Sequence, residues 1–194
     1  MQYIMHTLRK TLFKGNTDMS KTFTFDDKWN TRFMQMAQMI STWSKDPSTK
    51  VGCVIVSPNK EILSMGYNGF PRGVNDNIPE RQERPTKYEF VVHAEENALL
   101  NAGRNGTKLA GGILYVTMPP CTHCAGSIIQ SGISEVIYME PQIQKQIPGW
   151  RDTLNISFTM FDEAKVLHKP IKTDGLLNPE IISTLLSSAA IHCK

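Results

Sequence analysis

The sequence has few cysteines and no long apolar stretch, and each absence excludes a class of protein. Its 194 residues include four cysteines, Cys53, Cys121, Cys124 and Cys193, and only two of them stand close together. So sparse a set cannot supply a disulfide framework for a chain of this length, so we expect a reducing, cytoplasmic location. No apolar run approaches the roughly 20 residues of a membrane-spanning helix, so we expect no membrane partner.

The sequence also lacks a strong excess of positive or negative charge. Lys and Arg together number 21 against 18 Asp and Glu, which gives a net charge of +3, and the basic residues do not cluster along the chain. Proteins that track a nucleic-acid backbone gather their cations in such clusters, so we expect no nucleic-acid polymer as partner. A small phosphorylated molecule stays compatible with this composition, because one phosphate group needs only one or two cations.

One compact domain accounts for most of this length. We expect it over residues 23–170, with an N-terminal extension over 1–22 and a C-terminal tail or helix over 171–194. The extension has cations but no acid before Asp18, which only loosely resembles a transit peptide.

Apolar spacing predicts alternating helices and strands. A repeat of three and four residues predicts an amphipathic helix over 26–43, capped by Asp26 or Asp27, and further helices follow from 93 and from 121. Short apolar runs predict strands at 51–56, 61–69, 112–118 and 133–140. The first two strands form a hairpin, and the later alternation with helices implies a parallel crossover. We therefore expect the α/β class, a three-layer α/β/α sandwich with a central mixed sheet.

Two segments have no clear period. Residues 70–90 are polar and rich in proline and are expected to be a long loop, which in a compact domain is usually functional or mobile. Residues 142–167 are expected to add a short helix or loop and one more strand. A terminal helix is expected to begin at Asn178 and Pro179.

A histidine and two cysteines stand at the starts of two predicted helices. The segment His-Ala-Glu at 93–95 lies 28 residues before Cys121, and Cys-Thr-His-Cys at 121–124 directly follows a proline. Helix starts present unpaired N–H groups and a positive dipole end, which favour thiolates. His93, Cys121 and Cys124 can therefore hold one zinc ion and leave the fourth tetrahedral position open to an activated water molecule.

Other interpretations of these residues need weighing. A Cys-x-x-Cys pair also occurs in redox proteins and in structural zinc sites, where His123 would be the nearest fourth ligand. The redox interpretation explains neither His93 nor Glu95, and we expect His123 to face solvent. Glu95 is expected beside the metal-activated water, where a carboxylate can accept and return a proton. Cys53 is expected to be a core residue inside its strand.

The order H-x-E…P-C-x-x-C is the pattern of zinc-dependent nucleobase deaminases. Over roughly residues 28–140 the chain resembles the cytidine/deoxycytidylate deaminase superfamily, and its deoxycytidylate branch most closely. The resemblance rests on SKDPSTKVG (44–52), GYNGFPRG (66–73), HAEENA (93–98) and PPCTHC (119–124). The similar tRNA adenosine deaminases have a shorter link than the 24 residues between Asn68 and His93, and nucleoside-level cytidine deaminases usually carry cysteine in place of this histidine.

The resemblance implies hydrolysis of dCMP to dUMP and ammonia, which supplies dUMP for thymidylate synthesis. It implies one catalytic zinc ion per chain, held by His93, Cys121 and Cys124, with Glu95 as the proton shuttle.

The resemblance also implies substrate contacts. Asn68 would bind the sugar, Val51 and Met118 would line the base pocket, and the Ala94 N–H would meet the cytosine carbonyl. Asn68 could instead be a turn residue, and Val51 and Met118 could be plain core.

The residues that bind the phosphate are left open by the sequence. The favoured candidates lie in the loop before the first strand and are Lys45, Ser48 and Lys50. The alternatives lie in the long loop and are Arg81, Arg84 and Lys87.

The resemblance further implies a homo-oligomer, with a hexamer favoured, and dCTP and dTTP as effectors. Residues 66–69 resemble the regulatory segment, but Pro71-Arg72-Gly73 stands where some relatives have an asparagine before the glycine.

Three other functions compete with this expectation: deamination of dCTP, deamination of adenosine in tRNA, and a catalytically silent, nucleotide-sensing zinc fold. The complete His-Ala-Glu segment argues against silence, because a silent copy has no use for Glu95.

Overall fold

The computed structural model describes residues 22–140 and 150–172. These residues form a five-stranded sheet in the order β2-β1-β3-β4-β5. The strands are β1 (Gly52–Val56), β2 (Ile62–Tyr67), β3 (Ile113–Val116), β4 (Glu135–Met139) and β5 (Leu167–Ile171). β1 is antiparallel to both β2 and β3, whereas β3, β4 and β5 are parallel. The hairpin and the parallel crossover predicted from the sequence are both confirmed.

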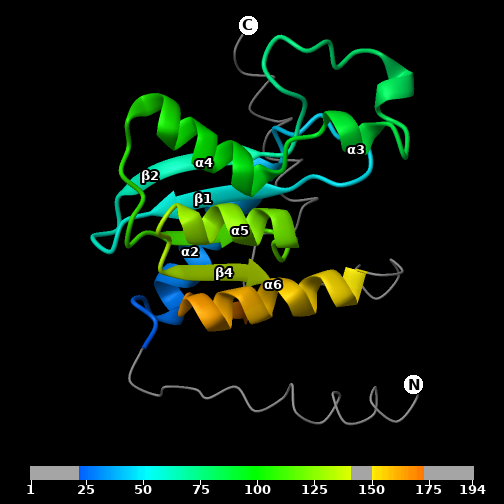
Figure 1. Ribbon diagram of the computed structural model, residues 1–194. Coiled ribbons are helices and arrows are strands. Elements are labelled where there is room, and N and C mark those ends of the chain that lie inside the picture. Colours follow the sequence, from blue (N-terminus) through cyan, green and yellow to red (C-terminus); the bar gives the residue numbers. More distant parts are fainter. Residues whose placement is uncertain (1–21, 141–149, 173–194) are drawn as a thin grey trace, which may run out of the picture.

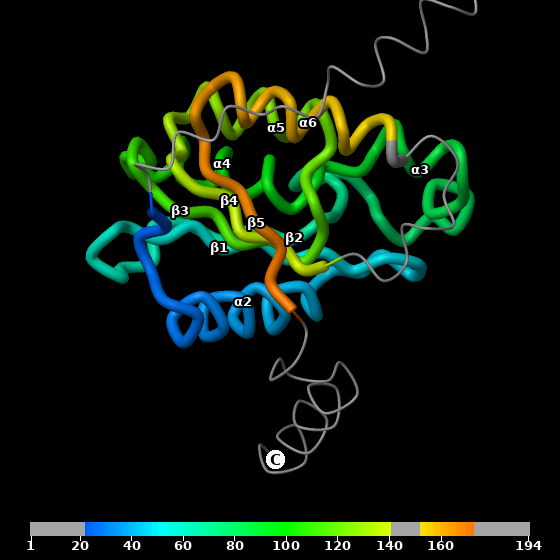
Figure 2. Tube along the Cα trace, turned by 90° about the horizontal axis from the view of Figure 1, so that it is seen from below, coloured from blue at the N-terminus to red at the C-terminus, as the bar shows by residue number. Residues whose placement is uncertain are grey.

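Helices cover both faces of the sheet (Figures 1 and 2). Helix α2 (Asp27–Ser41) lies on one face, and its N-cap Asp26 accepts a hydrogen bond from the Trp29 N–H, as expected. The opposite face carries α4 (Ala94–Asn105), α5 (Thr122–Gln130) and α6 (Trp150–Ala164). The three-layer α/β/α sandwich with a mixed sheet is therefore confirmed.

The sheet separates two apolar cores, because successive side chains of a strand point to opposite faces. Along β1, Cys53 and Ile55 join the core under α4 and α5, whereas Val54 and Val56 join the core under α2. Burial raises the pKa of the Cys53 thiol well above its ordinary value. Cys53 is therefore a neutral core residue, as expected.

Two glycines allow helices to approach the sheet closely. A β-carbon on Gly66 of β2 would lie 2.5 Å from the Ala94 carbonyl oxygen and closer still to the Ala98 nitrogen, both in α4. A β-carbon on Gly52 would meet the backbone of α2 at Ala37 in the same way. No side chain fits in such a space, so Gly66 sets the distance between β2 and the start of α4.

Residues 70–90 are mainly a loop, as expected, but they contain two short helical segments that the sequence did not reveal. These are the 3-10 turn Pro79–Arg81 and the four-residue helix α3 (Lys87–Phe90). A segment of one turn has too few residues to show an apolar period, which explains the difference. The ends of the loop are joined by backbone hydrogen bonds in both directions between Gly69 and Val92. The loop therefore folds back on itself beside the start of α4.

The segment after β4 differs in part from expectation. Helix α6 has 15 residues, longer than the short helix or loop predicted, and the expected additional strand, β5, begins only at Leu167. Leu154 and Phe161 are buried two turns apart on α6. Phe161 belongs to the core under α4 and α5, and Phe158 stacks on Tyr138 of β4, so packing stabilises a helix of modest intrinsic propensity. The helix expected from Asn178 lies outside the described residues. None of the helices in the described ranges is both long and apolar enough to span a membrane.

Candidate active site

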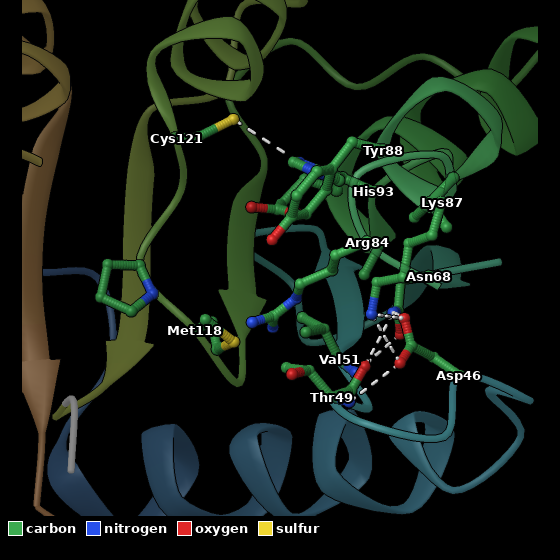
Figure 3. A pocket seen from close by; sticks show the side chains of 14 residues that line it. Asp46, Thr49, Val51, Asn68, Arg84, Lys87, Tyr88, His93, Met118 and Cys121 are labelled. Atoms are coloured by element: carbon green, nitrogen blue, oxygen red, sulfur yellow. Dashed lines mark hydrogen bonds and ion pairs between the residues drawn. The ribbon is translucent and has the colours of Figure 1, made fainter. Parts of the chain in front are cut away.

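A pocket lies where α4 and α5 begin and where the loop 70–90 folds over the sheet (Figure 3). Ligand sites in open α/β sheets form in this kind of crevice outside the carboxyl ends of strands, here beyond β3. The lining side chains come from the loop before β1, the turn after β2, the long loop, and the two helix starts. They are Asp46, Thr49, Val51, Asn68, Arg84, Lys87, Tyr88, Val91, His93, Ala94, Glu95, Met118, Pro119 and Cys121.

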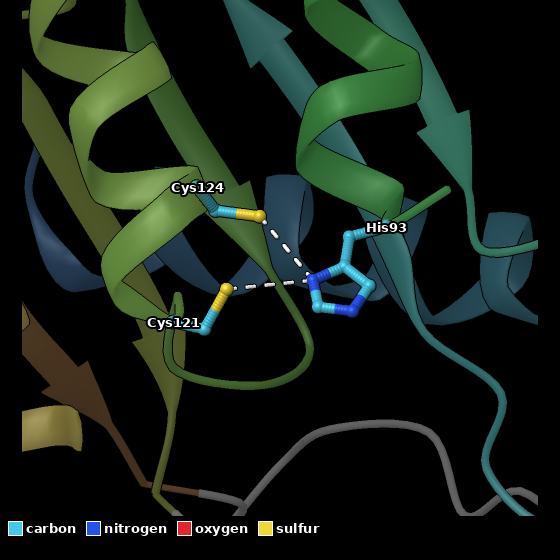
Figure 4. A group of neighbouring side chains, drawn as sticks. All are labelled: His93, Cys121 and Cys124. Carbon is cyan, nitrogen blue, oxygen red and sulfur yellow. Dashed lines mark hydrogen bonds between the residues drawn. The ribbon is translucent and has the colours of Figure 1, made fainter. Parts of the chain in front are cut away.

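His93, Cys121 and Cys124 converge at one end of this pocket (Figure 4). His93 is the N-cap of α4 and Cys121 is the N-cap of α5, as the sequence predicted. The Nδ1 atom of His93 lies 3.5 Å from Sγ of Cys121 and 3.4 Å from Sγ of Cys124. In the described part of the chain this is the only group of three or more such side chains arranged to hold a metal ion.

These separations fit a tetrahedral zinc ion. Bonds of about 2.1 Å to nitrogen and 2.3 Å to sulfur, at the tetrahedral angle, place the two ligand atoms about 3.6 Å apart. The observed separations of 3.4 and 3.5 Å are close to that value. Three protein ligands leave one coordination position open, which is the arrangement of a catalytic zinc site rather than a structural one.

Without metal, the three ligand side chains differ in their pKa values and so in their protonation. A hydrogen bond from Cys124, and after it the hydrogen bond with His93, lowers the pKa of Cys121 to about 3 against the effect of burial. The hydrogen bond with Cys121 raises the pKa of His93 to about 9, and burial opposes this rise. The pKa of Cys124 is raised by its bond to Cys121 and by burial. At neutral pH one thiolate therefore faces an imidazolium and a neutral thiol, so metal binding must release protons.

Glu95 lies in the first turn of α4, lines the pocket, and is only 4% exposed. Burial raises the pKa of its carboxyl to about 7, although the charge of His93 acts in the opposite direction. Glu95 is outside the group of converging ligand atoms. A buried carboxyl with a pKa near neutrality, beside a metal site, is suited to accept and return a proton.

Asn68 has a structural role and also lines the pocket. Its Oδ1 accepts a hydrogen bond of 2.8 Å from the Val51 N–H, and its Nδ2 donates one of 2.8 Å to the Thr49 carbonyl. Asn68 thus ties the turn after β2 to the loop before β1, as the turn interpretation expected. An amide oxygen has a second lone pair, so these bonds leave Oδ1 with capacity for a substrate hydroxyl.

Next to Asn68, Lys87 and Asp46 form a buried ion pair that was not predicted from the sequence. The Lys87 Nζ is 2.8 Å from Oδ2 of Asp46, and the side chains are 6% and 2% exposed. Burial acts to raise the pKa of Asp46, but hydrogen bonds from Lys87 and from the N–H groups of Thr49 and Ser48 outweigh it and lower that pKa. The segment Asp-Pro-Ser-Thr at 46–49 is a signal for such a side-chain-to-backbone turn, and could have identified Asp46.

The structure brings some of the expected substrate-binding residues together and leaves others apart. Val51, Met118 and Ala94 all line the pocket with Asn68. Lys45 and Lys50 do not line this pocket. The Lys45 Nζ lies 2.8 Å from a carboxylate oxygen of Asp76, and these two residues line a neighbouring cavity instead.

The structure also shows the surroundings of Ser48 and His123. The Ser48 hydroxyl accepts a hydrogen bond of 2.6 Å from Lys87 and donates one to Asp46, so it is part of the buried network. The side chain of His123 is 72% exposed and lies 3.6 Å from Glu96, which confirms that it faces solvent.

Residues 27–140 match the family model described as the cytidine and deoxycytidylate deaminase zinc-binding region. The chain belongs to this deaminase family. The matched region contains all three converging ligands, so the ion that they hold is zinc.

Individual members of the deaminase family support the assignment. An uncharacterized deaminase in the luxG 3' region of Aliivibrio fischeri is 46% identical over 139 residues, 72% of this chain and 90% of the relative. Human deoxycytidylate deaminase is 43% identical over 117 residues, 58% of this chain and 65% of the relative. The crystal structure of the dCMP deaminase from the cyanophage S-TIM5, in complex with dCMP and dUMP, matches with a TM-score of 0.61 at 26% identity and covers 76% of this chain and 99% of that one.

Proposed function

We propose that this deaminase hydrolyses dCMP to dUMP and ammonia and so supplies dUMP for thymidylate synthesis. The observation that carries the proposal is the open His93, Cys121 and Cys124 zinc set with buried Glu95 beside it in one pocket. The substrate named for the human relative and for the phage structure is the nucleotide that this arrangement suits. We also propose a reducing, cytoplasmic location, in which Cys121 and Cys124 stay available as metal ligands.

Zinc, when bound, acts as a Lewis acid that activates a water molecule at the open coordination position. Glu95 accepts the proton of the attacking water and delivers it to the ring nitrogen N3 of cytosine. As the new C–O bond forms at C4, Glu95 takes the remaining proton from that C4 hydroxyl and passes it to the amino group. The C4–N bond then breaks, ammonia leaves, and a carbonyl remains at C4. The pKa of about 7 that burial gives this carboxyl allows both transfers near neutral pH.

The remaining pocket residues orient the nucleoside. Ala94 is the first residue of α4, so its N–H has no carbonyl partner within the helix and is suited to donate to the cytosine carbonyl. Val51 and Met118 line the pocket as apolar walls for the base. The remaining lone pair of Asn68 Oδ1 accepts a sugar hydroxyl, and the hydrogen bonds that hold Asn68 keep this acceptor in place.

We also propose that the enzyme is a homo-oligomer, with a hexamer favoured, and that dCTP and dTTP are its effectors. Support for association comes from three exposed apolar side chains near the edge strand β2, namely Trp43, Met65 and Tyr67. A second cavity borders the segment that resembles the regulatory loop, with Tyr67, Phe70 and Arg72 in its lining.

The activity is tested by measuring ammonia release from dCMP, dCTP, deoxycytidine and CMP, each with and without added dCTP or dTTP. We expect rapid turnover of dCMP and an effect of the two triphosphates on it. Turnover of none of these by the zinc-loaded protein would favour a tRNA substrate or a silent nucleotide sensor. Faster turnover of dCTP than of dCMP would show that the triphosphate, and not the monophosphate, is the substrate.

The metal is tested separately by elemental analysis. We expect one zinc ion per chain in the wild type, and a loss of bound zinc in Cys124→Ala. Cys53→Ala is the matched control, because Cys53 is equally buried and belongs to the same core as Cys124 but is not among the converging ligand atoms. A Cys124→Ala variant that retained a full zinc ion would contradict the assigned ligand set.

A further inference from the structure

A nucleotide phosphate bound at this pocket needs a cation, and the pocket-lining residues offer three. Lys87 is one, but its ammonium lies 2.8 Å from Asp46 and donates to Ser48, and it is almost completely buried. His93 is the second, and its Nδ1 faces the two cysteine sulfurs. The third is Arg84, which is exposed to solvent and which, among the described residues, has no carboxylate within ion-pair distance.

Arg84 is directed toward the substrate space. Its side chain extends from the long loop into the pocket in the direction of Met118 (Figure 3). The guanidinium carbon lies 5.8 Å from the centroid of the Tyr88 ring, which lines the same pocket. The Tyr88 ring is an exposed platform for a cation, and its hydroxyl adds a neutral donor at the same place.

The buried ion pair holds Arg84 and Tyr88 over the pocket. Lys87 lies between them in the chain, three residues after Arg84 and one before Tyr88. Because Lys87 is fixed to Asp46 in the loop before β1, the segment that carries Arg84 and Tyr88 cannot move away from the pocket without breaking a buried ion pair. Lys87 is therefore a positioning residue, and Arg84 is the cation that it presents.

We propose that Arg84 binds the 5'-phosphate of the nucleotide and is the residue that makes this deaminase prefer a monophosphate to a nucleoside. This inference rests on the proposed function. A guanidinium matches phosphate oxygens in a two-bond geometry that an ammonium cannot reproduce. One guanidinium binds one phosphate, whereas a triphosphate would bring further negative charge to a pocket whose lining, as the structure describes it, contains no second unpaired cation. The preference is thus for dCMP over both deoxycytidine and dCTP.

The test compares kcat/KM for dCMP and for deoxycytidine in zinc-loaded wild type, Arg84→Gln, Arg84→Lys and Arg81→Gln. Arg81 is the matched control, because it belongs to the same loop but donates to the Asn75 carbonyl and stacks 4.9 Å from the Phe90 ring, outside the pocket lining. Arg84→Gln should lower the ratio of the two kcat/KM values by about 10- to 100-fold, the loss expected for a charged hydrogen-bonding partner. Arg84→Lys should give an intermediate ratio.

A ratio in Arg84→Gln equal to that of the wild type would overturn the assignment, and so would an equal fall in Arg81→Gln. A binding measurement separates this inference from the proposed function. In calorimetric titrations with dUMP and deoxyuridine, Arg84→Gln should reduce the preference for dUMP by a similar factor whether or not the wild type turns over dCMP. Phosphate-dependent binding that Arg84→Gln leaves intact would reject Arg84 as the phosphate ligand even in an active enzyme.

Discussion

The ammonium of Lys87 lies 2.8 Å from the carboxylate of Asp46, and this buried pair joins two segments that are 41 residues apart in the chain. One segment is α3, which carries Tyr88 beside the pocket. The other is the loop before β1, where the same carboxylate accepts from the N–H groups of Ser48 and Thr49. The Thr49 carbonyl in turn holds Asn68. A single ion pair therefore supports both the mouth of the pocket and the residue proposed to bind the sugar.

Breaking this pair should be costly because it leaves a buried charge without a partner. We expect Asp46→Asn or Lys87→Met alone to lower the free energy of unfolding by about 3–5 kcal/mol, and the double variant to lose much less than the sum. Urea unfolding of the zinc-loaded proteins measures this coupling. Lys45→Met is the control, because the Lys45–Asp76 pair has a lysine side chain that is 67% exposed, and its loss should cost at most about 1 kcal/mol. Additive single effects would show that the buried pair does not act as a unit.

Acid should remove the contribution of Asp46. Its pKa in the folded protein is below the ordinary value of 3.8, so the unfolded state binds the proton more readily. The stabilisation is therefore present above pH 3.8 and is lost as the pH falls through the lower, folded pKa. The difference in unfolding free energy between wild type and Asp46→Asn should be constant from pH 7 to pH 5 and shrink below pH 4. A difference that grew in acid would contradict the lowered pKa.

Glu95 and Glu96 are adjacent but should respond differently to the same substitution. Glu95 is buried in the pocket, whereas Glu96 lies 3.6 Å from the exposed His123. Glu95→Gln should reduce kcat by at least about 100-fold with bound zinc unchanged, because the amide cannot transfer the proton. Glu96→Gln should retain most of the activity. Substantial turnover by Glu95→Gln would remove Glu95 from its role as proton shuttle.

Zinc binding should release protons at neutral pH. In the metal-free site the pKa of His93 is raised to about 9 and that of Cys124 is also raised, whereas the pKa of Cys121 is lowered to about 3. Two of the three ligands are therefore protonated at pH 7, and coordination displaces about two protons. Calorimetric titration of the metal-free protein with zinc, in buffers of different ionisation enthalpy, counts them. Release of no proton would show that the free site is already fully deprotonated.

Two glycines that face or belong to α4 should respond in opposite directions to alanine. In Gly66→Ala the new methyl group would meet the helix backbone at Ala94 and Ala98, so we expect a loss of at least about 1–3 kcal/mol and reduced activity through displaced His93 and Glu95. Gly103 lies in α4 itself with open space around it, so Gly103→Ala should stabilise by about 0.5–1 kcal/mol and leave activity unchanged. Thermal unfolding measures the stability of both variants, and ammonia release from dCMP measures their activity. A stable, fully active Gly66→Ala variant would show that the close approach is not needed.

The mixed three-layer sandwich and the zinc ligands could be predicted because their signals are local. An apolar run identifies a buried strand such as Gly52–Val56, and the residues that precede an amphipathic stretch identify a helix start. His93 and Cys121 both occupy such starts, so their chemistry and their placement follow from the same short segments. The length of α6 was not predictable in this way, since packing of Phe158 and Phe161 against the core decides it.

By itself the sequence identified the three residues that converge to hold the metal and predicted that Glu95 lies beside them, because ligand type and spacing along the chain carry that information. It could not determine which charged residue faces the pocket. Lys45, Arg84 and Lys87 are all cationic residues near the same loops. Lys45 is exposed and pairs with Asp76, Arg84 enters the pocket, and Lys87 is buried against Asp46. The fold of an aperiodic loop decides among them, because a buried ion pair forms only where tertiary structure brings its two partners together out of water.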